Sequence, residues 1–279
     1  MNRHKLEEAA AKFFMLASVF AIAGVFLTII VTIAVKGGGA LSLEMITSQS
    51  GGGFYMGQGG GILNAIVGSL AIGIGSSALA LLISLPVAVY INFYAGKNGK
   101  IANAVRTALD ILWGIPSIVY GAAGFLIMTL AGIKISLLAG IITVTLLILP
   151  VMARIIDEAL SSLPAQLIEA SYALGSTRLE TTLKIALRKC LPGIITAVLI
   201  SFGRGIGDAA SVMFTAGYSD YVPDSLLAPA ATLPLAIFYQ LGTPNATVQA
   251  CAYGAALVLV IIVLSLSILV RFINRKWAH

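Results

Sequence analysis

Two residues of opposite charge, Arg204 and Asp208, stand inside a long apolar segment of the chain. A charge exposed to hydrocarbon is costly, so both side chains are expected to face protein or water. At positions i and i+4 they would share one face of a helix and could form an ion pair. A guanidinium also offers planar donors that match the oxygens of a carboxylate or a phosphate. The pattern therefore allows either a structural ion pair between helices or a site for an anion.

The residue types that most often perform catalysis or bind metals are scarce. The only histidines, His4 and His279, lie at the two ends of the sequence, and Cys190 and Cys251 are too far apart for a CxxC pair. A hydrolase inside a membrane would need a nucleophile and a base, and no apolar segment supplies a histidine or lysine for that role. We therefore expect no catalytic site, metal or cofactor in this chain.

Two glycine patterns resemble nucleotide-binding loops only superficially. Residues 73–78 fit the loose form of the dinucleotide fingerprint but lie in the middle of an apolar segment, where close packing of helices through small residues explains them better. Lys100 follows a glycine but precedes Ile101, where a Walker A loop requires Ser or Thr. Any work driven by ATP must then be done by another polypeptide.

The composition indicates a membrane protein. Of the 279 residues, 59% are hydrophobic and only 10% charged, with a mean hydropathy of +1.00, whereas soluble domains carry roughly a quarter of their residues as charged side chains. A helix that crosses a bilayer needs about 20 mostly apolar residues. The predicted spans are residues 13–35, 62–94, 105–131, 133–152, 193–215 and 251–270. We expect a single all-α transmembrane domain over residues 1–279.

Basic residues predict the orientation, because Lys and Arg concentrate on the cytoplasmic side of membrane proteins. Fourteen of the seventeen lie at the termini or in alternate connections: Arg3, Lys5, Lys12, Lys97, Lys100, Arg106, Arg154, Arg178, Lys184, Arg188, Lys189, Arg271, Arg275 and Lys276. Both termini are therefore expected in the cytoplasm, and the basic charge needs no nucleic acid as partner. The glycine-rich residues 37–61 would form a flexible loop outside.

The connection over residues 153–192 is predicted to be structured. Pro164 suits the first turn of a helix, and Gly175 stands where a left-handed residue would end that helix. Thr177 and Glu180 then have the spacing of a capping box that starts a second helix. Two short helices joined by a glycine corner would make a rigid projection that a partner could push, or a helix lying at the membrane interface.

Residues 169–175 (Glu-Ala-Ser-Tyr-Ala-Leu-Gly), followed by Ile185 and the Leu-Pro-Gly-Ile of residues 191–194, resemble the EAA loop of ABC-importer permeases. The resemblance implies a coupling helix that docks onto a cytoplasmic ATPase, with Glu169, Ala170 and Gly175 as the matching positions. Arg188 stands where many members of that family have proline.

Three further segments narrow the resemblance to the PstA-type permeases of phosphate importers. They are residues 60–69, 114–121 and 203–216, and the similarity extends over roughly residues 35–275. The family usually has Glu where this sequence has Asp208, which keeps the charge but shortens its reach. The resemblance implies that Arg204 and Asp208 line the translocation path. Asp110 is a weaker candidate for the path than Arg204 and Asp208, and the alternative is an ion pair near the inner surface with Arg106, four residues earlier.

The resemblance also implies an architecture and a set of partners. The fold would be that of a type I ABC importer permease with six spans, in the plasma membrane of a prokaryote. Its partners would be a second, PstC-type permease, a PstB-type ATPase dimer, an external PstS-type binding protein, phosphate and membrane lipid. The alternative substrates are molybdate, tungstate, sulfate or phosphonate. An ion-coupled secondary transporter is a further alternative, although the unequal halves argue against an inverted repeat.

Overall fold

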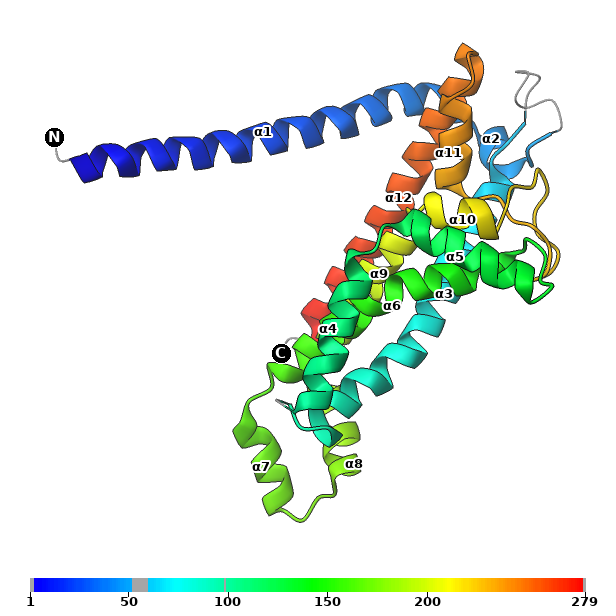
Figure 1. The fold of residues 1–279 in the computed structure, drawn as a ribbon. Helices are drawn as coiled ribbons and strands as arrows, with labels where there is room; N and C mark the ends of the chain where they lie inside the picture. The colour runs from blue at the N-terminus through cyan, green and yellow to red at the C-terminus, as the bar shows by residue number, and fades with distance from the viewer. Residues whose placement is uncertain (1–2, 52–59, 98, 278–279) are drawn as a thin grey trace.

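The computed structural model describes residues 3–51, 60–97 and 99–277, and these residues form helices without any β-strand. The connection that carries α7 and α8 projects from one end of the molecule (Figure 1). The elements are α1 (Arg3–Ala40), α2 (Leu43–Thr47), α3 (Leu63–Val89), the π-helix η2 (Tyr90–Tyr94), α4 (Lys100–Gly114), α5 (Ser117–Leu130), α6 (Leu137–Ser161), α7 (Ala165–Ala173), α8 (Arg178–Glu180), the π-helix η3 (Thr181–Ala186), α9 (Leu187–Ile206), α10 (Ala210–Thr215), α11 (Leu233–Leu241) and α12 (Ala246–Trp277).

Five helices are long and apolar enough to cross a membrane, and a bent pair of helices makes a sixth segment if the two are counted as one span. Five are continuous helices: Ala10–Ala40, Leu63–Tyr94, Leu137–Ser161, Arg178–Ile206 and Ala246–Phe272. The sixth consists of α4 and α5, which meet at an angle of 98°. The chain is thus an all-α, multi-pass membrane protein, and it reaches the six spans predicted from hydropathy when the bent pair is counted as one span.

The third span is broken where the sequence analysis expected a continuous helix over residues 105–131. α4 ends at Gly114, Ile115 has an extended backbone with ψ of 130°, and α5 begins after Pro116. A proline disfavours helical geometry in the residue before it and cannot donate a backbone hydrogen bond. Ile115 and Pro116 therefore interrupt the helix between α4 and α5.

The fifth span also differs in its limits from the predicted residues 193–215. Its helix starts directly after the cap at Thr177, continues through η3 and past Pro192, and ends at Ile206. Three residues separate it from α10. Since α6 extends to Ser161, the connection between α6 and α8 is much shorter than the predicted residues 153–192.

The glycine-rich residues 37–61 are only partly a loop. Residues 37–40 continue α1, and α2 follows with Ser42 as its N-cap, whose side chain accepts a hydrogen bond from the Met45 amide. Residues 52–59 lie outside the described part of the chain. α1 thus extends through three glycines, which are poor helix formers, beyond the limit of 35 that hydropathy predicts.

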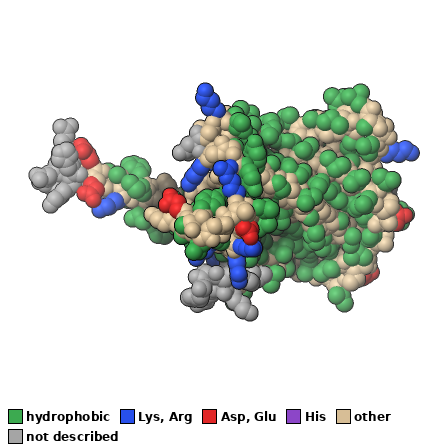
Figure 2. Space-filling model, turned by 90° about the horizontal axis from the view of Figure 1, so that it is seen from below, with side chains coloured by type: hydrophobic (Ala, Val, Ile, Leu, Met, Phe, Trp, Pro, Cys, Tyr) green, Lys and Arg blue, Asp and Glu red, His purple; other side chains and the backbone are tan. Residues whose placement is uncertain are grey.

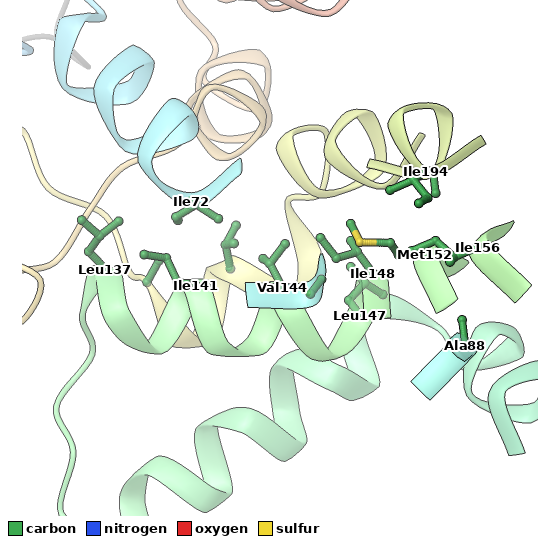
Figure 3. Close-up of a cluster of buried hydrophobic side chains, with 14 of the residues drawn as sticks. Ile72, Ala88, Leu137, Ile141, Val144, Leu147, Ile148, Met152, Ile156 and Ile194 are labelled. Atoms are coloured by element: carbon green, nitrogen blue, oxygen red, sulfur yellow. The ribbon is translucent and has the colours of Figure 1, made fainter. Parts of the chain in front are cut away.

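α6 is the most buried of the spans and packs against α3, α4, α5, α9 and α10. Figure 3 shows its apolar side chains facing α3 and α9; they are Leu137, Ile141, Val144, Leu147, Ile148, Met152 and Ile156. Glycines on the neighbouring helices allow this approach: a Cβ at Gly75 would lie 2.9 Å from Ile141, and one at Gly205 would lie 3.0 Å from Val144. Close packing therefore holds the bundle together, as expected where lipid competes for apolar contact.

α1 extends away from the rest of the bundle and contacts α12 (Figure 1). At that contact a Cβ on Gly37 would lie 2.5 Å from the carbonyl oxygen of Tyr253, and the Lys36 ammonium lies 4.8 Å from the centre of the Tyr253 ring. The apolar window of α1 is otherwise exposed in this chain. Its surface is apolar all round, which suits a helix surrounded by lipid.

Candidate functional site

α7 ends at a left-handed glycine, as the sequence predicts. Gly175 has a φ of +82°, and the amide of Ser176 beyond it donates to the carbonyl oxygen of Ser171 at 3.2 Å. Pro164 is the N-cap of α7 and does not lie in the first turn as predicted. Because side chains with a Cβ are strained at this φ, Gly175 fixes the corner between α7 and α8.

The capping box predicted at Thr177 and Glu180 is present. The Thr177 hydroxyl accepts from the Glu180 amide at 3.2 Å, and the Glu180 carboxylate accepts from the Thr177 amide at 3.0 Å. The same carboxylate lies 3.1 Å from the ammonium of Lys184. This cap begins the helix that becomes the fifth span, so α7 is joined to that span through one short, ordered corner.

α7 presents some of its side chains to solvent and one to the protein interior. Glu169 and Ala170 are exposed. Ser171 is buried, and its hydroxyl lies 2.8 Å from the hydroxyl of Thr181, which is fully buried in η3. The sequence analysis included Ser171 only as a member of the motif of residues 169–175, and it did not single out Thr181. Their contact fixes α7 against the start of the fifth span.

Charged side chains join α4 to α6 near the end that carries α7. Arg106 lies 2.8 Å from the Asp157 carboxylate, and Arg154 lies 2.9 Å from Asp157 and 2.7 Å from Asp110. The alternative pair of Asp110 with Arg106 is therefore wrong, because each residue pairs with α6 instead. Asp157 was missed, although its place three residues after Arg154, near the end of a largely apolar helix, is a visible signal.

Hydrogen bonds extend this charged cluster to the end of α6. The Asn92 amide donates to Asp157 at 2.8 Å, the Ser161 hydroxyl donates to Asn92 at 2.9 Å, and the Lys97 ammonium donates to the Ser161 carbonyl. Ser161 is the last residue of α6, four residues before α7 begins. The cluster thus ties η2, α4 and α6 together next to the start of α7.

Arg204 and Asp208 do not form the ion pair that their spacing predicts. α9 ends at Ile206, so Asp208 lies beyond the helix and its carboxylate accepts from the amide of Ser211 at 2.8 Å and from the Ser211 hydroxyl. Asp208 therefore caps the start of α10. The i, i+4 geometry fails because the helix stops between the two residues.

The Arg204 guanidinium lies near the break in the third span. It lies within electrostatic range of the Tyr120 hydroxyl, which donates to the carbonyl oxygen of Leu112 across the break at 2.9 Å. Gly205, the next residue, packs against Val144 and Ile148 of α6, so Arg204 lies beside the apolar part of a helix that is long enough to cross a membrane. Among the residues that the structure describes, no carboxylate forms an ion pair with Arg204.

Two observations concern metal binding and the cysteines. Within the described ranges, no group of three or more His, Cys, Asp or Glu side chains could hold a metal ion. Cys190 and Cys251 are free thiols, the first buried and the second half-buried. The polar groups with a clear spatial arrangement are thus the α7 corner, the cluster around Asp157 and the surroundings of Arg204.

Polar and apolar side chains occupy different parts of the surface. Seen from the end that carries α7 and α8, Lys and Arg side chains gather around that end, while hydrophobic side chains cover the broad flank (Figure 2). A flank of this kind fits contact with lipid or with other membrane helices, and a basic end fits the side where positive charge accumulates.

The comparisons with known proteins define the class. Residues 84–279 match the family described as binding-protein-dependent transport system inner membrane component, and the chain belongs to this family. It is therefore a permease subunit of an ABC importer. Among solved structures it is similar to a chain of the MetNI methionine ABC transporter in an inward-facing conformation, with 27% identity and a TM-score of 0.63 over 77% of this chain and 95% of that one. The fold is that of a type I ABC importer permease.

The names of similar curated proteins are more specific about the substrate. The chain is 33% identical to the phosphate transport system permease protein PstA 2 of Mycobacterium bovis, over 79% of this chain and 75% of the relative. It is 34% identical to a probable phosphate permease PstA of Methanocaldococcus jannaschii, over 76% and 75% of the two chains. Over almost the full length it is 32% identical to YqgI, a probable ABC transporter permease of Bacillus subtilis, covering 98% and 97%.

Proposed function

We propose that this chain is the PstA-type permease of an importer that takes up inorganic phosphate at the expense of ATP. The proposal is carried by Arg204, which lies beside the apolar part of α6 and whose guanidinium no carboxylate of the described chain neutralises. The relatives named as phosphate permeases support the same substrate. A phosphate oxyanion passing the break between α4 and α5 would find planar donors there.

In this proposal Asp208 does not pair directly with Arg204 but stabilises the structure beside the path. Its carboxylate holds the first turn of α10 through Ser211, and α10 packs against α5 so closely that a Cβ at Gly121 would lie 2.9 Å from the Ala210 carbonyl oxygen. Asp208 thus keeps the broken parts of two spans together beside the path. The guanidinium is left available for an anion in transit.

The corner around α7 would couple the path to ATP. Glu169 and Ala170 are exposed and form the surface that docks onto a cytoplasmic ATPase, while Gly175 and the buried contact of Ser171 transmit movement of α7 to the fifth span. The cluster around Asp157 carries the same movement to α4, the first half of the broken span. This chain would perform no hydrolysis itself.

The partners follow from this arrangement. They are a second, PstC-type permease that completes the path, a PstB-type ATPase dimer, and an external PstS-type protein that delivers phosphate. α7 and both termini would then lie in the cytoplasm, in agreement with the basic residues at that end. Other oxyanions, among them molybdate, tungstate, sulfate and phosphonate, are the alternative substrates.

The test is uptake of labelled phosphate by cells that depend on this transporter, with Arg204→Gln compared with Lys134→Gln, which removes a charge from the connection between α5 and α6. Loss of uptake in the Arg204 variant alone, with the complex still copurifying, is the expected result. Uptake that tolerates Arg204→Gln would contradict the role of the guanidinium. Loss of the assembled complex would instead make Arg204 a structural residue.

A further inference from the structure

A groove of about 690 Å³ runs between α3 and the helix formed by η3 and α9. Its wall is almost entirely aliphatic, with two cations at one end. The lining residues are Leu81, Leu85, Leu183, Lys184, Leu187, Arg188, Leu191 and Ile194. The sequence analysis used Arg188 only as one of the basic residues that predict the orientation and as a departure from the family pattern, and neither the path nor the α7 corner uses it.

The order of these residues along the helices sets the direction of the groove. Lys184 and Arg188 precede Leu191 and Ile194 in the fifth span, so the cations lie toward the end that carries α7, where basic side chains gather (Figure 2). The aliphatic part continues along the two spans into the membrane. A ligand that matches both parts has an anionic head and an apolar tail.

The charges in the groove favour such a ligand. Lys184 and Arg188 are one helical turn apart, and like charges at that spacing repel each other. Glu180 lies 3.1 Å from the Lys184 ammonium and offsets that charge. Arg188 is exposed and has no ion-pair partner in the part of the chain that the structure describes. One uncompensated positive charge thus remains beside an apolar channel.

We infer that this groove binds an anionic phospholipid, whose phosphate lies between Arg188 and Lys184 and whose acyl chain lies along the leucines of α3 and α9. Basic side chains between spans on the cytoplasmic side are a recurrent kind of site for anionic headgroups. The aliphatic part of a membrane lipid meets the groove without crossing water, because the groove lies between two spans. The inference does not depend on which substrate the transporter carries.

The assembled transporter, purified in detergent and stripped of lipid, is titrated with phosphatidylglycerol or phosphatidylcholine, and the bound lipid is counted by native mass spectrometry. Arg188→Gln is compared with Lys189→Gln, which removes the same charge from the adjacent, exposed residue that does not line the groove. We expect Arg188→Gln to weaken binding of phosphatidylglycerol about fivefold and Lys189→Gln to leave it unchanged. Phosphatidylcholine binding should respond to neither.

A second variant tests the apolar part of the groove. Leu183 is 55% exposed and lines the groove, so Leu183→Trp should fill the space without disturbing the core and should reduce retention of phosphatidylglycerol. Equal losses in the Arg188 and Lys189 variants would show attraction to the whole basic surface and overturn the assignment. Binding that appears only after removal of the ATPase subunit would show that a protein partner covers the groove, and would overturn it too.

Discussion

The guanidinium of Arg106 in α4 lies 2.8 Å from the carboxylate of Asp157 in α6, and the Asp157 side chain is only 2% exposed. The contact joins the first half of the broken span to the helix that leads directly into α7. A displacement of α7 would thus reach α4, which ends at the break before Pro116, through the charged contacts between α6 and α4. The pair gives a physical route between the proposed docking surface and the proposed path.

Loss of the Asp157 charge should destabilise the transporter. Asp157→Asn would leave Arg106 and Arg154 facing each other without their shared carboxylate, and breaking a buried pair in this way costs about 3 kcal/mol or more. The melting temperature of the purified complex measures the effect. Asp110→Asn is the control, because Asp110 is 51% exposed and such pairs contribute about 1 kcal/mol at most. Equal shifts for the two variants would contradict the central place of Asp157.

The hydroxyl contact between Ser171 and Thr181 should matter for coupling. Ser171→Ala or Thr181→Val leaves one buried hydroxyl without a partner, at a cost of about 1–3 kcal/mol. The double variant should be no worse than either single one, because no hydroxyl is then left alone. The readout is the number of phosphate ions imported per ATP hydrolysed by the reconstituted transporter. Additive effects of the two substitutions would argue against a direct contact.

Gly175 should tolerate only residues that adopt a left-handed backbone. Gly175→Ala is expected to cost about 1 kcal/mol and Gly175→Pro to disrupt the corner, whereas Gly175→Asn should be milder. Uptake should be highest with Gly175→Asn, lower with Gly175→Ala and lowest with Gly175→Pro, while the complex still assembles. Gly24→Ala in α1 is the matched control, since a Cβ there would meet nothing within 4 Å and should favour the helix. A Gly175→Ala variant with normal uptake would contradict the rigid corner.

The orientation can be tested independently of transport. Single cysteines at Glu169 and at Tyr221, both exposed, are introduced after Cys190 and Cys251 are replaced by serine. In cells that lack the ATPase subunit, a membrane-impermeant maleimide added to intact cells should label the cysteine at Tyr221 and should reach that at Glu169 only after the cells are opened. The reverse pattern would place α7 outside and remove the basis for coupling to a cytoplasmic ATPase.

Local features of the α7 region could be predicted from the sequence. Gly175 and the capping box of Thr177 and Glu180 depend on backbone rules that act within a few residues, and both predictions are confirmed. The number of spans follows from hydropathy alone for a similar reason, because the bilayer sets a minimum length. Family membership then followed from short motifs that this chain retains.

Contacts between spans could not be predicted in the same way. Asp110 and Arg106 were paired because they are four residues apart, but each has a partner on α6 that becomes near only through packing. The predicted ion pair of Arg204 and Asp208 is absent because the helix ends at Ile206, a limit that hydropathy does not show. The break at Pro116 was open to prediction, since the residue before a proline disfavours helix.

Import by the purified transporter, reconstituted in vesicles with its ATPase and binding protein, tests the central proposal most directly. Labelled phosphate is supplied outside and ATP inside, with sulfate, molybdate, phosphonate and methionine as competitors. The proposal predicts accumulation of phosphate that requires ATP, resists an excess of each competitor and disappears with Arg204→Gln. Accumulation of one of the competitors, with phosphate left outside, would contradict it.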